Sequence, residues 1–224
     1  MEKSDHSSNP RIINATFVIA TLICLLPMVA GIILWNSLPD TVAYHFTADG
    51  TPDGWGPRII PVYIVPIALA ALTMLMCGLF NAQPGFNAAL RLACCYCLPL
   101  TGAVVGGCYY AFILGHNIDL LLIIMLLMGF IIALIGNYLP KTPVSLINIE
   151  VQAAHGGYVP EDAAASAKKR ATKRAGRFMF VCGIVLMAAS LTPWKAGLLY
   201  AWCAVFVVGL VVIVSTAGLI KMND

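Results

Sequence analysis

Charged residues are the scarcest component of this chain. Asp, Glu, Lys and Arg make up 10% of the 224 residues, whereas hydrophobic residues make up 60%. Soluble domains carry roughly 25% charged residues, so too little polar surface remains here to cover a water-soluble globule. The composition therefore predicts a membrane protein. The net charge of +3 is small, and the one basic cluster lies beside an apolar run, so we expect no nucleic-acid partner.

Charge is missing altogether from the interiors of six long apolar runs. They cover residues 12–35, 59–81, 92–114, 119–139, 178–193 and 197–220. Crossing the hydrocarbon core takes about 20 residues of helix, and a helix satisfies its backbone groups within its own segment. We therefore expect an all-α polytopic membrane protein, a bundle of six transmembrane helices. The run at 12–35 is longer than the apolar part of a signal peptide, about 7–15 residues, so we expect an uncleaved first helix.

This lack of ionisable groups also bears on function. Ion- or proton-coupled transport usually needs an ionisable residue at bilayer depth, and no H-E-x-x-H motif of a metalloprotease is present. We accordingly predict neither an enzyme nor a cofactor. Cysteines are present, but we expect them to pack as small hydrophobes. All of them lie in the apolar runs: Cys24, Cys77, Cys94, Cys95, Cys97, Cys108, Cys182 and Cys203.

Lys and Arg are distributed unevenly between the two sides of the predicted membrane. Six spans put both termini on one side, together with the 82–91 and 140–177 loops. Eleven of the 13 basic residues fall on that side, and only Arg58 and Lys195 fall on the other. The positive-inside rule therefore predicts that both termini are cytoplasmic and that residues 38–58 face outward.

The chain divides into four predicted parts. They are a two-helix unit at 1–81, helices 3 and 4 at 82–139, a cytoplasmic loop at 140–177 and helices 5 and 6 at 178–224. Glu161 and Asp162 are expected to begin a short helix in the loop that runs into the fifth span. Its basic residues should attract anionic membrane lipid by about 1 kcal/mol each. They are Lys168, Lys169, Arg170, Lys173, Arg174 and Arg177.

The outward segment at 38–58, "LPDTVAYHFTADGTPDGWGPR", is polar and rich in turn formers. "TVAYHF" is typical of a short extended stretch, and the pairs Asp49-Gly50 and Asp53-Gly54 are typical of tight turns. One interpretation is a compact cap over the helix ends, with Trp55 folded back as a lid. Three of the four tryptophans, Trp35, Trp55 and Trp194, fall at this boundary, where amphipathic rings settle.

The same segment supports chemical hypotheses. His45, Asp49 and Asp53 are candidate ligands for a divalent metal such as zinc, joined by His116 and Asp119 from the other outward loop. His45 with Asp53 also suits acid–base chemistry. The counted outer charges, four Asp against Arg58 and Lys195, give −2 and would attract a cationic amphipathic peptide. The candidate ligand-binding residues are His45, Phe46, Asp49, Asp53 and Trp55.

Two motifs resemble one family. The outward segment resembles the signature of the domain that begins SdpI-type immunity proteins, through Leu38, Pro39, His45, Phe46, Gly50, Asp53, Gly54 and Trp55. "IGNYLPKTPVSLI" resembles its second signature, through Gly136, Asn137, Tyr138, Leu139, Pro140 and Lys141. The cytoplasmic loop departs from the family pattern: "NIEVQAAHGGYV" replaces a Gly-Ile-Arg-Thr-Pro-Trp stretch, and Lys173 stands where His is usual.

The resemblance implies a multi-pass protein of the bacterial plasma membrane. Characterised relatives protect cells from a secreted antimicrobial peptide toxin and can hold a transcriptional repressor at the membrane. Two alternatives remain open: a transporter of a small or lipidic substrate, favoured by Pro27, Pro66 and Pro99 within spans, and a membrane metalloenzyme. Gly102 and Gly106 in "TGAVVGG" fit either packing within the bundle or dimerisation.

Overall fold

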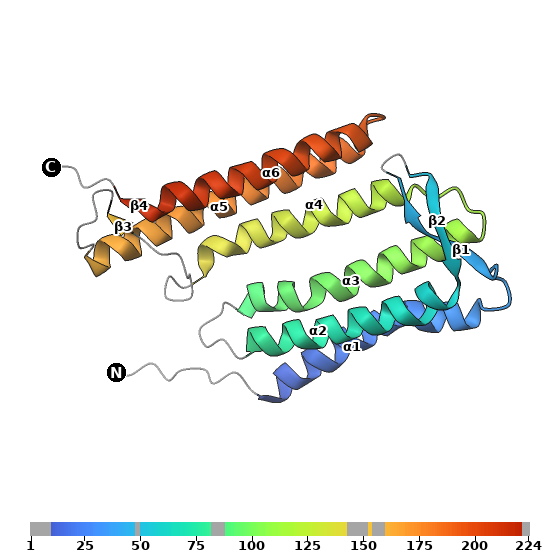
Figure 1. The fold of residues 1–224 in the computed structure, drawn as a ribbon. Helices are drawn as coiled ribbons and strands as arrows, with labels where there is room; N and C mark the ends of the chain where they lie inside the picture. The colour runs from blue at the N-terminus through green and yellow to red at the C-terminus, as the bar shows by residue number, and fades with distance from the viewer. Residues whose placement is uncertain (1–9, 48–49, 82–87, 143–151, 154–159, 221–224) are drawn as a thin grey trace. The chain divides into compact units, whose positions relative to one another are not determined.

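The chain folds into long helices with one small hairpin (Figure 1). The computed structural model describes residues 10–47, 50–81, 88–142, 152–153 and 160–220. The helices are α1 (Pro10–Ile33), α2 (Val65–Asn81), α3 (Ala88–Ile113), α4 (Leu120–Tyr138), α5 (Glu161–Ser190) and α6 (Lys195–Gly218). Shorter elements are β1 (Thr41–Phe46), β2 (Pro52–Pro57), the π-helical turn η1 (Ile60–Ile64), the 3-10 turn η2 (Leu139–Lys141), β3 (Gln152–Ala153) and β4 (Leu219–Ile220). The predicted all-α membrane fold is confirmed.

Five of the described helical segments are long and apolar enough to cross a bilayer. They are Ala15–Ile33, Ile60–Phe80, Ala88–Ile113, Leu120–Lys141 and Lys195–Ile213. Helix α5 does not meet the same criterion, because its first half is polar and basic and only its second half is apolar. It does begin at Glu161 and continue unbroken to Ser190, as the sequence predicts for a cytoplasmic helix running into the fifth run.

The chain divides into two compact units, which we describe separately. The first comprises residues 1–45, 52–84 and 94–118, and the second comprises residues 46–51, 85–93 and 119–224. Most of α3 therefore groups with α1 and α2, whereas α4 groups with α5 and α6.

In the first unit, α1, α2 and α3 run side by side (Figure 1). The Cys24 thiol and the Thr73 hydroxyl form a buried hydrogen bond of 3.2 Å between α1 and α2. A Cβ atom on Gly106 would lie 2.8 Å from the Pro27 ring of α1. A Cβ atom on Gly102 would lie 3.0 Å from the Leu69 side chain of α2. Both glycines thus pack within the chain, which is the first of the two interpretations offered by their spacing.

In the second unit, α4 and α5 pack backbone to backbone through glycines. A Cβ atom on Gly136 would lie 2.5 Å from the Phe180 nitrogen, and one on Gly129 would lie 2.7 Å from the Gly183 carbonyl oxygen. Helix α6 joins α5 through the stacked rings of Phe178 and Phe206, whose centroids lie 6.1 Å apart, and through a 2.8 Å hydrogen bond that Trp202 Nε1 donates to the Cys182 carbonyl oxygen. The glycines allow α4 and α5 to approach this closely, and such close contact between helices supplies packing energy in lipid.

Candidate ligand-binding hairpin

The outward segment forms a two-stranded hairpin of β1 and β2. The extended conformation predicted for "TVAYHF" is confirmed, since β1 covers those six residues. The Thr47 amide donates to the Thr51 carbonyl oxygen over 2.9 Å, and the Gly50 amide donates to the Thr47 carbonyl oxygen over 2.9 Å. Gly50 has a φ of +88°, a left-handed conformation that favours glycine. This signature position therefore serves the turn.

The second predicted turn is wrong: Asp53-Gly54 lies inside β2. The chain reverses earlier, around Gly50, so residues 52–57 pair with β1. Gly54 is required for a different reason, because its Cβ would lie 2.7 Å from the His45 Cβ and 3.5 Å from the Tyr44 ring. Gly56 is equally confined, at 2.9 Å from the Tyr44 ring. Glycine backbone in β2 thus makes room for the Tyr44 ring.

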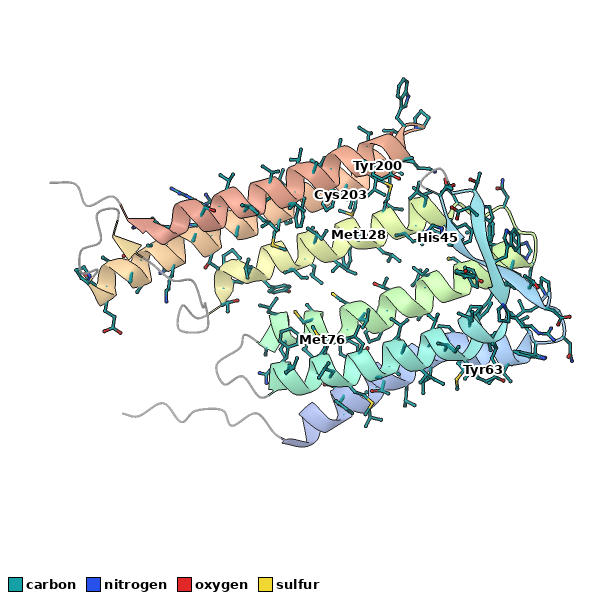
Figure 2. All side chains as sticks on the ribbon, in the orientation of Figure 1. His45, Tyr63, Met76, Met128, Tyr200 and Cys203 are labelled. Atoms are coloured by element: carbon teal, nitrogen blue, oxygen red, sulfur yellow. The ribbon has the colours of Figure 1, made fainter. Side chains whose placement is uncertain are left out.

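One face of the hairpin carries an exposed polar pair. His45 Nδ1 donates to Asp53 Oδ1 over 2.5 Å, and the two side chains are 65% and 43% exposed. His45 extends from the hairpin in Figure 2. Trp55, two residues beyond Asp53 in β2, lies on the same face and is 59% exposed. Trp55 is therefore not folded back as a lid. Tyr44 is 56% exposed, but its ring lies against Gly54 and Gly56, on the other face of β2.

Hydrogen bonds tie the hairpin to the helices of the first unit. The Tyr109 hydroxyl of α3 donates to the Ala43 carbonyl oxygen of β1 over 2.6 Å. The Tyr110 hydroxyl donates to the Pro61 carbonyl oxygen over 3.2 Å. The first bond anchors β1 and the second anchors η1, which follows the hairpin, so His45 lies on a supported strand.

Arg58 holds the base of the hairpin to the end of α1. Its Nη1 donates to the carbonyl oxygens of Trp35 at 2.8 Å and Leu38 at 2.7 Å. The guanidinium lies 4.3 Å from the Trp35 ring centroid, and it forms a 3.0 Å ion pair with Asp40. The last carbonyls of a helix have no partner within it, and Arg58 satisfies carbonyls just beyond α1.

The remaining signature residues have distinct environments. Leu38 is buried against Val62 and Tyr110, whereas Pro39 is exposed and Phe46 is half-buried. In the second signature, Gly136 lies against α5, Asn137 is exposed, and Pro140 contacts Gly176 of α5. Lys141 lies over the Tyr138 ring at 4.7 Å. The second signature therefore builds a helix contact.

Of the proposed metal ligands, the structure brings only two together. His45 and Asp53 meet, while Asp49 lies outside the described residues. Asp119 accepts from the Leu122 amide at the start of α4 and pairs with Lys195, and His116 is exposed. Among the described residues, no group of three His, Cys, Asp or Glu side chains is arranged to hold a metal ion.

The cysteines are all free thiols. Cys94 and Cys97 have the C-x-x-C spacing, but both lie within the apolar helix α3. Cys24, Cys77, Cys95 and Cys182 are buried, as expected of small hydrophobic residues, while Cys203 is exposed.

Three of the four acidic side chains counted as outward charges have partners. Asp40 pairs with Arg58, Asp53 with His45 and Asp119 with Lys195. The fourth, Asp49, lies outside the described residues. Arg58 and Lys195, the two basic residues in that count, are thus paired locally, and the formal charge of −2 rests on Asp49 and Asp53. The exposed aromatic rings are a second distinctive feature of the hairpin.

Sequence reasoning missed three contributors: Arg58, Tyr109 and Tyr44. The role of Arg58 could have been suspected, since it is one of two basic residues on the predicted outer side. The role of Tyr109 could not, because its partner Ala43 is far away in the sequence.

Comparison with known families supports the first signature. A family model described as a domain of unknown function (DUF1648) matches residues 22–70, which include much of α1, the hairpin and the start of α2. This domain is the N-terminal domain of SdpI-type proteins. The chain matches no curated protein and no solved structure.

Proposed function

We propose that this membrane protein is of the SdpI type and gives bacteria resistance to a secreted antimicrobial peptide by binding it at the hairpin. The observation that carries the proposal is the exposed Trp55 beside the His45–Asp53 pair, within the stretch matched by the family model. Tryptophan and tyrosine side chains supply much of the energy at binding surfaces, and they are enriched at protein interfaces and membrane interfaces.

The geometry suits a peptide that is both apolar and cationic. Trp55 offers ring surface for apolar side chains and for cation–π contacts with Lys or Arg. Asp53 offers a carboxylate whose present partner, His45, is an exposed group. A cationic side chain of the peptide would compete with His45 for Asp53, at modest cost because exposed pairs are weak.

The experiment is protection of toxin-sensitive bacteria. Cells expressing the full chain should tolerate a higher concentration of at least one cationic peptide than cells with an empty vector. Trp55→Ala and Asp53→Asn should each lower that tolerance at equal protein level. Trp194→Ala is the matched control, since Trp194 is an exposed tryptophan outside the hairpin. Unchanged killing by every peptide tested, or equal loss from Trp194→Ala, would refute binding at the hairpin.

The proposal includes six spans, with α5 as the fifth. Its apolar residues 178–190 rise only about 20 Å, against a hydrocarbon core of about 30 Å. Two contacts support a crossing nonetheless. Gly176 lies against Pro140, just beyond one end of α4, and Lys195, just beyond α5, pairs with Asp119 at the other end of α4. Helix α5 and the turn that follows it therefore extend over the length of α4.

The proposal also places the hairpin outside and both termini in the cytoplasm of a bacterium. The support is the predominance of Lys and Arg on the predicted inner side. A membrane-impermeant thiol reagent applied to whole cells tests this orientation. Asp40→Cys should react, and Lys169→Cys should react only after lysis, each measured against the parent chain. The reverse pattern would invert the orientation.

A further inference from the structure

The first half of α5 sorts its basic side chains by exposure. The exposed basic residues are Lys169, Arg170, Lys173, Arg174 and Arg177. At 3.6 residues per turn, these five positions fall within an arc of about 140° over about 12 Å of helix. We call this surface the basic arc. The buried positions of the same stretch lie on the opposite face: Ala167, Ala171, Thr172 and Gly176.

Lys168 is not part of the basic arc. It lies about 100° outside the arc by the same geometry, and it is only half-exposed. The sequence alone grouped it with its neighbours as one cluster of six. The structure thus separates one lysine from five otherwise similar residues on the same helix.

The basic arc begins where the apolar part of α5 ends. Arg177 directly precedes the apolar residues 178–190. Gly176 contacts Pro140, and Lys141 follows Pro140 at the polar end of α4. Arg177 of α5 and Lys141 of η2 therefore lie at the same end of the α4–α5 pair, next to the apolar residues 178–190. No acidic residue follows Asp162 within α5, so nothing on the arc neutralises it.

We propose that the basic arc binds the headgroups of anionic phospholipids. Anionic membrane surfaces attract Lys and Arg within about a Debye length. The inference rests on the proposed crossing of α5, which puts its apolar half in the membrane and the headgroups where the arc begins. This continuity favours a lipid over a soluble partner. The inference is independent of any ligand at the hairpin.

The test uses the full chain in bilayers of equal phosphatidylglycerol and phosphatidylcholine, with native mass spectrometry counting the lipids that remain bound. The wild type should retain phosphatidylglycerol preferentially. Lys173→Gln with Arg174→Gln should reduce that preference by roughly fivefold for each charge removed. Lys168→Gln should leave it unchanged. Lys169→Gln with Arg170→Gln gives a second double variant on the arc, and thermal unfolding identifies any variant that fails to fold.

Three results would overturn the proposal. If the wild type retained the two lipids equally, the arc would not bind anionic headgroups, and an acidic protein would be the remaining partner. An equal loss from Lys168→Gln would make total charge, not the arc, the determinant. A loss of phosphatidylglycerol preference from Arg174→Lys as large as from Arg174→Gln would show that positive charge on the arc is not what retains the anionic lipid, because lysine keeps the charge.

Discussion

The two compact units differ in the contacts that hold their helices together. Besides the packing of Gly102 and Gly106 on side chains of α2 and α1, the first has directed polar contacts at the hairpin end, such as Arg58 with Trp35 and Tyr109 with Ala43. The second uses close backbone approach along α4 and α5, at Gly136 and Gly129. Helices in lipid gain little from apolar burial, so packing and hydrogen bonds must supply the association energy.

This difference separates two kinds of signature residue. The first signature contains exposed groups, His45, Asp53 and Trp55, on a hairpin that other residues support. The second contains Gly136 and Pro140, which contact α5. A change at these exposed groups of the first signature should therefore affect binding more than folding, and a change at Gly136 or Pro140 should affect folding.

The largest effect should come from Gly136→Ala. The new Cβ would lie 2.5 Å from the Phe180 nitrogen and 2.7 Å from the Gly176 carbonyl oxygen, so α4 and α5 must move apart. We expect a loss of about 3 kcal/mol, the upper range for overpacking, measured by thermal unfolding of the purified protein in detergent. Gly197→Ala is the control, because nothing lies within 4 Å of its Cβ position. Equal stability of both variants would contradict glycine-mediated packing.

A smaller loss is expected from Arg58→Ala. It removes two hydrogen bonds from a charged donor and leaves the Trp35 and Leu38 carbonyls without them. The expected cost is about 2 kcal/mol, followed in the same unfolding assay. Asp40→Asn removes only the ion pair with a 91% exposed carboxylate and should change stability by less than about 1 kcal/mol. If the two variants behave alike, Arg58 acts through Asp40 and not through the backbone.

Tyr109→Phe should cost about 1 kcal/mol, the usual contribution of one hydrogen bond. It deletes the hydroxyl that donates to Ala43 and preserves the ring. Tyr200→Phe, at a 65% exposed position of α6 (Figure 2), should leave stability unchanged. Faster hydrogen exchange at β1 in the first variant alone would locate the effect at the hairpin, and an unaltered β1 would argue against this anchoring.

The smallest effect on stability should come from Asp53→Asn. The pair with His45 is exposed, so we expect a change below about 1 kcal/mol, even though protection from peptide should fall. Thermal unfolding followed by circular dichroism measures the stability, and the protection assay on the same variant measures the loss of protection. A large drop in melting temperature would mean that Asp53 belongs to the scaffold of the hairpin.

The extent of sequence-based prediction differs between these regions. The helices were predictable because each must satisfy its backbone within one segment, and the predicted runs at 59–81 and 119–139 match η1 with α2 and α4 closely. The extended stretch of β1 was predictable from its β-branched and aromatic residues. The position of the turn was not, because two Asp-Gly pairs competed and only the pairing of strands selected Gly50.

Membrane class, helix positions and the polar character of the hairpin depend on residues that are close together in the chain, so the amino-acid sequence was sufficient for them. Contacts between distant segments required the tertiary structure: Arg58 on Trp35, Gly136 on α5, and Tyr109 on β1. The same holds for the separation of Lys168 from the basic arc, because the buried face of a helix is chosen by what packs against it. Neighbouring residues determine where helices and strands form, and only the packing between them decides which side chains stay exposed for binding.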